Sequence, residues 1–390
     1  MADAHLASAL ESPATPAELR PFYEQFRELH SKKLWYQLTL LIDEFLRHPA
    51  SQQGTFQIDL YENFIRTFAK SINQLKLANF GVIVSRQFSG TSHTHTDAAR
   101  AYEFLHALAQ EAEQKDLQDA YVLLAMEAAH FQLLLGDVVA TKTAMDKSAK
   151  VLDSFDSVEP VVHASFYRVS GNYHKSKAEY ADYYRNFLLF LACINVEADM
   201  STAEQVQCAH DLAISALLGD TIYNFGELLL HPILASLHGT EYAWLSELLV
   251  AFNAGDIGRF EALIPRLAQE PILETNVAFL RQKICLMALI ENVFKRSTDN
   301  RTLSFETIAK ETHIPVNEVE HLVMKALCLG LIRGAIDEAE QLVRITWVQP
   351  RVLDAGQTKA LLERLSGWCD RVQHVSEFVK SQSPELLSHA

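Results

Sequence analysis

Two histidines separated by one threonine, His93 and His95, are followed by Asp97, and these residue types at this spacing could bind a metal ion. A catalytic zinc site needs about three protein ligands held together. The histidines lie in a stretch rich in Ser, Thr and Gly, residues 87–96, which is typical of a loop, and no Ser-x-x-Asp motif follows downstream. The alternative is that Thr96 or Asp97 caps the next helix, and this is the interpretation we favour.

Other catalytic signatures are absent from the sequence. It contains no HExxH, P-loop, Rossmann glycine pattern, EF-hand loop or GxSxG motif. No two carboxylates have a spacing that indicates acid–base catalysis. We therefore predict no catalytic residue, no metal, no cofactor and no enzymatic activity.

Nucleic-acid binding is the second chemistry to consider, because residues 303–354 have the pattern of a winged helix. The pattern predicts two helices and then two strands: 305–310 after a Ser304 cap, 317–328 after the break at His313-Ile-Pro, 331–336 and 342–348. Gly330 ends the second helix. In many proteins such a module binds DNA.

The charges of this module argue against DNA. A helix in the major groove needs Lys or Arg to meet phosphates. The candidate recognition helix begins Asn-Glu-Val-Glu and carries Lys325 as its only full positive charge, and the wing tip carries Asp337, Glu338 and Glu340. The whole chain has 34 Lys and Arg against 49 Asp and Glu, a formal net charge of −15. We predict a winged helix used to bind protein, with no nucleic-acid partner.

The second strand of the module is the candidate protein-binding element. Residues 342–348 are rich in β-branched and aromatic side chains, which suits pairing with a strand of a neighbouring chain. The residues predicted to bind a partner are Leu342, Arg344, Ile345 and Trp347. The alternative is that this strand only completes a two- or three-stranded sheet, and the two interpretations are compatible.

The rest of the chain is helical in pattern. Three Gly-Asp pairs, at 136, 219 and 255, each follow an apolar helical segment, where glycine can end one helix and aspartate can cap the next. Helix pairs stacked in this way form an irregular, tetratricopeptide-like α-solenoid, an architecture that binds other proteins. Five isolated cysteines without a CxxC indicate buried, reduced thiols in a cytosolic or nuclear protein. No apolar run is long enough to span a bilayer, so no membrane partner is expected.

A last helix is predicted for residues 357–381. Its apolar residues recur with spacings of four, three, four, three and four, which is a heptad pattern. These residues are predicted to join a helix bundle with other chains, and they are Leu361, Leu365, Trp368, Val372, Val375 and Val379. Burial of all six would stabilise a bundle by at most about 9–18 kcal/mol. The alternative is that this helix folds back on its own solenoid.

Six strings of the sequence resemble the PCI-domain subunits of the 26S proteasome regulatory-particle lid, over nearly the whole chain. They are KLWYQLTL (33–40), LYENFI (60–65), NFGELLLHP (224–232), AFNAGD (251–256), VNEVE (316–320) and ITWVQPRVLD (345–354). Pro315 departs from similar chains, which have a capping hydroxyl there, and the loop at 89–96 diverges as well.

The resemblance implies a mostly α fold with five parts. These are a flexible N-terminal arm (1–20), N-terminal helical repeats (21–170), the helical part of a PCI domain (171–296), its winged helix (297–348), and an assembly helix with a tail (349–390). It implies a non-catalytic scaffold in the cytoplasm and nucleus. The implied partners are other lid PCI subunits, among them the PCI subunit numbered 12, the lid helix bundle and a nearby ubiquitin receptor; no homo-oligomer is expected. Rival interpretations are a PCI subunit of the signalosome or of an initiation-factor complex, a nucleic-acid-binding regulator, and a hydrolase centred on His93 and His95.

Overall fold

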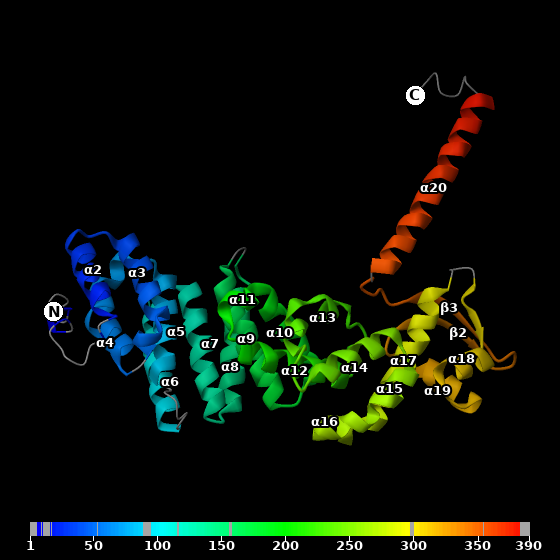
Figure 1. The fold of residues 1–390 in the computed structure, drawn as a ribbon, viewed down its shortest axis with the longest axis horizontal. Helices are drawn as coiled ribbons and strands as arrows, with labels where there is room; N and C mark the ends of the chain where they lie inside the picture. Colours follow the sequence, from blue (N-terminus) through cyan, green and yellow to red (C-terminus); the bar gives the residue numbers. More distant parts are fainter. Residues whose placement is uncertain are drawn as a thin grey trace. The chain divides into compact units, whose positions relative to one another are not determined.

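Two compact units make up the chain, Met1–Met200 and Ser201–Ala390. The computed structural model describes residues 6–8, 10, 16, 18–52, 54–88, 95–114, 117–155, 158–296, 300–353 and 355–382. Helices dominate both units, and one small sheet lies in the second (Figure 1). The predicted class, a helical-repeat solenoid followed by a winged helix and a C-terminal helix, is confirmed.

The first unit is a series of helices that pack on their sequence neighbours. They are α2 (Arg20–Ser31), α3 (Trp35–Arg47), α4 (Phe56–Asn63), α5 (Gln74–Phe88), α6 (His95–Gln114), α7 (Gln118–Leu134), α8 (Val138–Leu152), α9 (Pro160–Ser176), α10 (Tyr180–Cys193) and α11 (Val196–Asp199), with short 3-10 helices at Pro49–Gln52 and Ile65–Ser71. Helix α7 contacts α6, α8 and α9, and α10 packs on α9 (Figure 1). Each helix therefore buries its apolar face against near neighbours, as a solenoid does.

Aromatic rings fill the core at the start of the first unit. Phe26, Phe45 and Phe64 are fully buried, and the ring of Phe26 contacts Phe45 edge-on and Phe64 at a tilt. Leu6 and Leu19 are buried in the same cluster, so these two residues of the predicted N-terminal arm are packed. The arm and the other domain boundaries remain predictions.

Two of the three Gly-Asp pairs end and begin helices as predicted. Gly255 has the left-handed backbone (φ +66°), and the side chain of Asp256 accepts a hydrogen bond from the amide of Arg259 at 3.0 Å. The pair at 136 has the same arrangement, with φ +90° for the glycine and a capping aspartate. The pair at 219 does not: Gly219 has φ −62°, and Asp220 makes no capping bond at the start of a helix.

The second unit has a helical part, a winged helix and a terminal helix. Its helical part comprises α12 (Thr202–Leu218), α13 (Gly226–Leu230), α14 (Ala243–Ala254), α15 (Ile257–Leu263), α16 (Pro271–Thr275) and α17 (Val277–Lys295), with 3-10 helices at Pro232–Leu237 and Ile264–Gln269. Helix α17 lies centrally, because it contacts α12, α14 and α15 as well as the winged helix. Its residues are buried without interruption from Lys283 to Glu291.

The winged helix consists of β1 (Thr302–Ser304), α18 (Phe305–Thr312), α19 (Val316–Cys328), β2 (Ile332–Asp337) and β3 (Leu342–Val348). Ser304 accepts a hydrogen bond from the amide of Thr307, which confirms the predicted cap. Helix α18 ends because His313 takes the left-handed backbone (φ +52°), two residues before the proline that was expected to end it. The sequence pattern missed β1, which pairs antiparallel with β3.

The predictions for the cysteines and for membrane-spanning segments can also be compared with the structure. All five cysteines are free, but only Cys285 is buried, whereas Cys328 and Cys369 are exposed. The prediction of five buried thiols is therefore wrong, because Cys328 ends α19 and Cys369 lies on the uncovered helix α20 (Ala355–Gln382). No helix within the described residues is long and apolar enough to cross a membrane.

Candidate assembly surfaces

The predicted pairing strand, β3, is the central strand of its sheet. The strand order is β1-β3-β2, so β3 has a neighbour on both sides. The prediction that β3 lies at an edge of the sheet is therefore wrong. The strand is rich in apolar residues because it is central. Ile345 is only 5% exposed and packs inside the module, while Leu342 and Trp347 are half-buried and Arg344 is exposed. Whether these four residues contact a partner stays a prediction.

The sheet has two edge strands, β1 and β2, and β2 is the longer of the two. The amide of Ile345 donates to the carbonyl of Arg301, on the β1 side of β3, at 3.0 Å. Along a central antiparallel strand, the N–H and C=O groups of successive residues point alternately to the two neighbouring strands. Because the N–H of Ile345 points to β1, the N–H and C=O of Arg344 point to β2, where Arg344 lies opposite Ala335. The next residue of β2, Ile336, therefore directs its N–H and C=O away from β3. This edge can pair with a strand of another chain.

The exposed face of the sheet is shaped by an Arg–Trp contact. The guanidinium of Arg333 lies 4.7 Å from the ring centroid of Trp347, a cation–π geometry that holds the indole in place. A β-bulge falls between Arg333 and Gly334 and leaves Thr346 opposite no residue of β2. Thr346 donates its hydroxyl to the carbonyl of Arg333 at 3.1 Å. Trp347 is thus a fixed, half-buried aromatic group close to the free edge.

The basic side chains of α19 and of the wing are engaged by other residues of the chain and so are poorly placed to bind a phosphate backbone. Lys325, the only lysine of α19, donates to the side chain of Gln282 on α17 at 2.5 Å, so it is held against its own chain. The residues of α19 that face solvent include Glu318 and Met324. On the wing, Arg344 pairs with Glu340 at 3.7 Å. The geometry therefore adds to the charge argument for a protein-binding role.

The C-terminal helix α20 carries an uncovered apolar face. It was predicted for residues 357–381 and runs from Ala355 to Gln382. The six side chains of the heptad pattern, which we call the seam, are 42–63% exposed: Leu361, Leu365, Trp368, Val372, Val375 and Val379. Leu362 and Phe378 beside them are exposed as well. No seam side chain is buried in the second unit, and the choice between a bundle with other chains and a helix folded back on the solenoid stays a prediction.

The His93-x-His95 motif, considered and set aside as a metal site, lies mostly outside the described residues. His93 lies outside the described residues, and so does the side chain of His95, whose backbone begins α6. Asp97 lies in the first turn of that helix, where a carboxylate stabilises the positive end of the helix dipole. The prediction that Thr96 or Asp97 is the capping residue is therefore wrong, because the helix begins at His95 and includes both.

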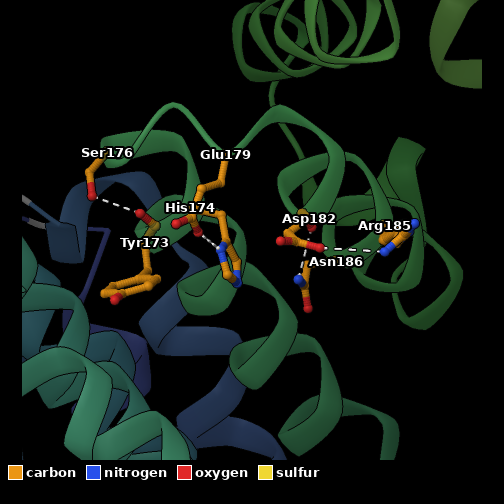
Figure 2. Close-up of polar contacts among 7 residues, drawn as sticks. All are labelled: Tyr173, His174, Ser176, Glu179, Asp182, Arg185 and Asn186. Atoms are coloured by element: carbon orange, nitrogen blue, oxygen red, sulfur yellow. Dashed lines mark hydrogen bonds and ion pairs between the residues drawn. The ribbon is translucent and has the colours of Figure 1, made fainter. Parts of the chain in front are cut away.

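A different His–Glu–Asp group joins α9 and α10. Potential ligand atoms of His174, Glu179 and Asp182 lie within 4.8 Å of one another (Figure 2). His174 Nδ1 lies 2.7 Å from Glu179, and a hydrogen bond from this nitrogen holds the pKa of that carboxyl below its usual value. Asp182 pairs with Arg185 at 3.5 Å. Since the imidazole nitrogen and both carboxylates have protein partners, this group fixes the turn between two helices rather than forming an open metal site.

The comparisons with known proteins agree with this architecture. The family described as PSD13 N-terminal repeats matches residues 22–249, and the PCI domain family matches residues 263–347. The chain belongs to the family of proteasome non-ATPase regulatory subunit 13. The 26S proteasome non-ATPase regulatory subunit 13 homolog A of Arabidopsis thaliana is 39% identical over 96% of this chain and 97% of its own length.

Two fungal relatives match over the same extent. The probable 26S proteasome regulatory subunit rpn9 of Schizosaccharomyces pombe is 40% identical over 96% of both chains. The 26S proteasome regulatory subunit RPN9 of Saccharomyces cerevisiae is 38% identical over 98% of this chain and 97% of its own. Matches of this length confirm the resemblance to lid PCI subunits and extend through the winged helix and α20.

Proposed function

We propose that this chain is a non-catalytic structural subunit of the 26S proteasome regulatory-particle lid. The observation that carries the proposal is the seam of α20: six large apolar side chains, exposed on a terminal helix, in a chain of this family. Isolated apolar residues are common on protein surfaces, but a continuous heptad row is not. Its occupant is a set of helices from other lid subunits. The protein therefore acts in ubiquitin-dependent degradation as a scaffold.

The second contact of the scaffold is the winged helix. We place it on the β2 edge, with Trp347 beside it, because β2 has six residues and is the longer of the two edge strands, whereas β1 has three. The neighbour there is another lid PCI subunit, the one resembling non-ATPase subunit 12. A ubiquitin receptor of the particle lies nearby, and the complex works in the cytoplasm and nucleus. These finer assignments rest on the resemblance to the lid PCI subunits.

Purification of the tagged chain from cell extract under mild salt tests the proposed function directly. Mass spectrometry should find the other lid subunits in near-equal amounts, together with the proteasome base. A chain that arrives alone, or that brings nucleic acid with it, would contradict the proposal. Treatment with nuclease before elution separates direct partners from those that share a nucleic acid.

Replacement of Ile336 by proline should weaken binding to the neighbouring PCI subunit about tenfold or more. Proline removes the outward N–H of β2 while leaving the bonds of Ala335 to β3 in place. One lost hydrogen bond accounts for about 0.5–1.5 kcal/mol, and the proline ring adds a steric block. Binding can be measured with the purified neighbour by calorimetry.

Ile336→Ala is the matched control, because it shortens the same half-buried side chain and keeps the N–H. If the alanine and proline variants bind equally well, the β2 edge is not the contact. Equal thermal unfolding temperatures of the two variants would show that the comparison reports binding rather than folding.

A further inference from the structure

Between β3 and α20 runs a short extended segment, residues 349–353, which we call the strap. Its first residue, Gln349, donates its amide to the carbonyl of Leu331 at 2.8 Å and so is tied to the winged helix. The following residues leave the winged helix and contact the helical part of the second unit. The strap is the only covalent link between these two bodies and the assembly helix.

Arg351 is the main anchor of the strap. Its side chain is 6% exposed, and its Nη1 pairs with the carboxylate of Glu291 on α17. Its Nη2 donates to both the backbone carbonyl and the side-chain oxygen of Asn253, at the end of α14, at 2.7 and 3.0 Å. One guanidinium therefore joins two helices to the strap, in the planar, multidentate geometry for which arginine is suited.

Val352 provides the second anchor. It lies against Gly226 at the start of α13, where an added Cβ would come within 2.4 Å of the valine Cβ. Glycine is needed at this position for close approach, since any side chain would displace the strap. Helix α20 begins at Ala355, three residues after this contact. The strap is thus held by α13, α14 and α17 a few residues before α20 begins.

A buried ion pair is weak evidence for stability, because desolvation of the two charges offsets most of their attraction. Its better-supported use is to specify one geometry. The strap anchors have that character, because Arg351 contacts two different helices through Glu291 and Asn253, and Gly226 leaves room for the side chain of Val352. A helix held at its base also loses less conformational freedom on binding than a tethered one.

We propose that Arg351 and the strap position α20, so that the seam and the winged-helix edge meet their partners in one rigid arrangement. Arg351 is a positioning residue: it acts through the strap and need not touch a partner. This inference rests on the proposed scaffold function. It adds that assembly depends on the docked strap as well as on the seam itself.

Native cysteines allow a direct test in the free chain. Cys328 at the end of α19 and Cys369 on α20 are both exposed and can carry spin labels, after replacement of the half-buried Cys193 and Cys208 by serine. Pulsed dipolar spectroscopy should give one narrow distance distribution for the native strap. Arg351→Ala should broaden it severalfold. Arg259→Ala, which removes a guanidinium from an exposed pair with Asp256, should leave the distribution unchanged.

Insertion of six Gly/Ser residues after Leu353 tests the consequence for assembly. The insertion leaves every strap anchor intact, so the thermal unfolding of the chain should not change. Affinity for the lid subunits should fall about tenfold or more, since a flexible tether lowers the effective concentration of the helix. This readout separates positioning from stability, even if Arg351→Ala folds poorly.

The outcomes distinguish this inference from the proposed function. If the insertion variant assembles like the unmodified chain, while a chain with a charged seam does not, the scaffold function stands and the strap has no positioning role. A narrow distance distribution in Arg351→Ala would overturn the inference as well. If the unmodified chain itself fails to bind lid subunits, the proposed function is wrong.

Discussion

A chain carrying Leu365→Asp, Trp368→Asp and Val372→Asp is expected to fold normally and to be lost from the proteasome lid. The three side chains are 47%, 62% and 54% exposed in the chain, so their replacement removes few internal contacts. In a bundle each would contribute about 1.5–3 kcal/mol by burial. Three buried carboxylates without partners would add a desolvation cost larger than this gain. The predicted effect is therefore loss of binding, beyond about a thousandfold.

The measurement is the amount of each lid subunit that co-purifies with the tagged variant, together with its thermal unfolding. The control places three carboxylates on the opposite faces of the same helix, in the variant Ser366→Asp, Gln373→Asp and His374→Asp. By heptad position these residues point away from the seam. The control should assemble like the unmodified chain. If the seam variant is incorporated into the lid normally, α20 does not contribute to assembly, and this part of the proposed function is wrong.

Local features of the fold could be predicted from the sequence because their causes are local. Capping by Ser304 and Asp256 follows from one hydroxyl or carboxylate placed before a helix, and both are present. The alignment of the six apolar side chains along α20 follows from their spacing in the sequence. Gly219 resembled the other glycines in sequence but has an ordinary backbone, because its carbonyl is held by the ammonium of Lys283 at 2.5 Å. That contact joins residues 64 positions apart, and no local pattern indicates it.

Features that depend on distant segments were missed for the same reason. The three residues of β1 are too few to show a period, and their pairing with β3 puts that strand in the centre of the sheet. Two partners of the strap, Gly226 and Asn253, lie in the strings 224–232 and 251–256 that carried the resemblance, and the strap itself lies in the string 345–354. The strings indicated the family, but not that Gly226, Asn253 and Arg351 meet at one place. Only the folded chain shows why these segments belong together.

Glu127→Gln should produce the largest loss of stability of the single changes considered, about 3–5 kcal/mol in the free energy of unfolding of the first unit. Glu127 lies on α7 with its side chain 5% exposed, and both its oxygens accept hydrogen bonds from Nη2 of Arg168 on α9, at 2.5 and 2.6 Å. Ser165 donates its hydroxyl at 2.8 Å. Glutamine keeps the shape but presents an N–H₂ to these donors and leaves a buried guanidinium without a counter-charge.

The pH dependence of unfolding provides a second test of the Glu127 ion pair. Burial raises the pKa of Glu127, but the charges of Arg168, Arg86 and His130 and the hydroxyl of Ser165 outweigh it, so the pKa lies below the ordinary 4.5. A carboxylate with a lowered pKa contributes stability above the unfolded pKa and loses it as the pH falls through the folded one. Stability of the native chain should therefore decline steeply below about pH 4.5.

His130 contributes a separate decline at higher pH. Burial, with the charge of Arg168, lowers its pKa from 6.5 to about 4, so the unfolded chain binds a proton more readily than the folded one between these values. Stability of the native chain should fall as the pH drops from 6.5 towards 4. Because the Glu127 carboxylate raises the pKa of His130, the decline due to His130 should extend to lower pH in Glu127→Gln, while the decline due to the Glu127 carboxylate is lost.

Chemical denaturation from pH 8 to pH 3 measures both effects, with Glu111→Gln as the matched control. Glu111 makes the same kind of pair with Arg66, at 2.8 Å, but both side chains are nearly half exposed. Exposed pairs contribute less than about 1 kcal/mol, so this variant should unfold almost like the native chain. A loss below about 1 kcal/mol in Glu127→Gln, or an unchanged acid profile, would show that α7 and α9 are held together by their apolar contacts alone. The ion pair would then matter for the register of the repeat rather than for its stability.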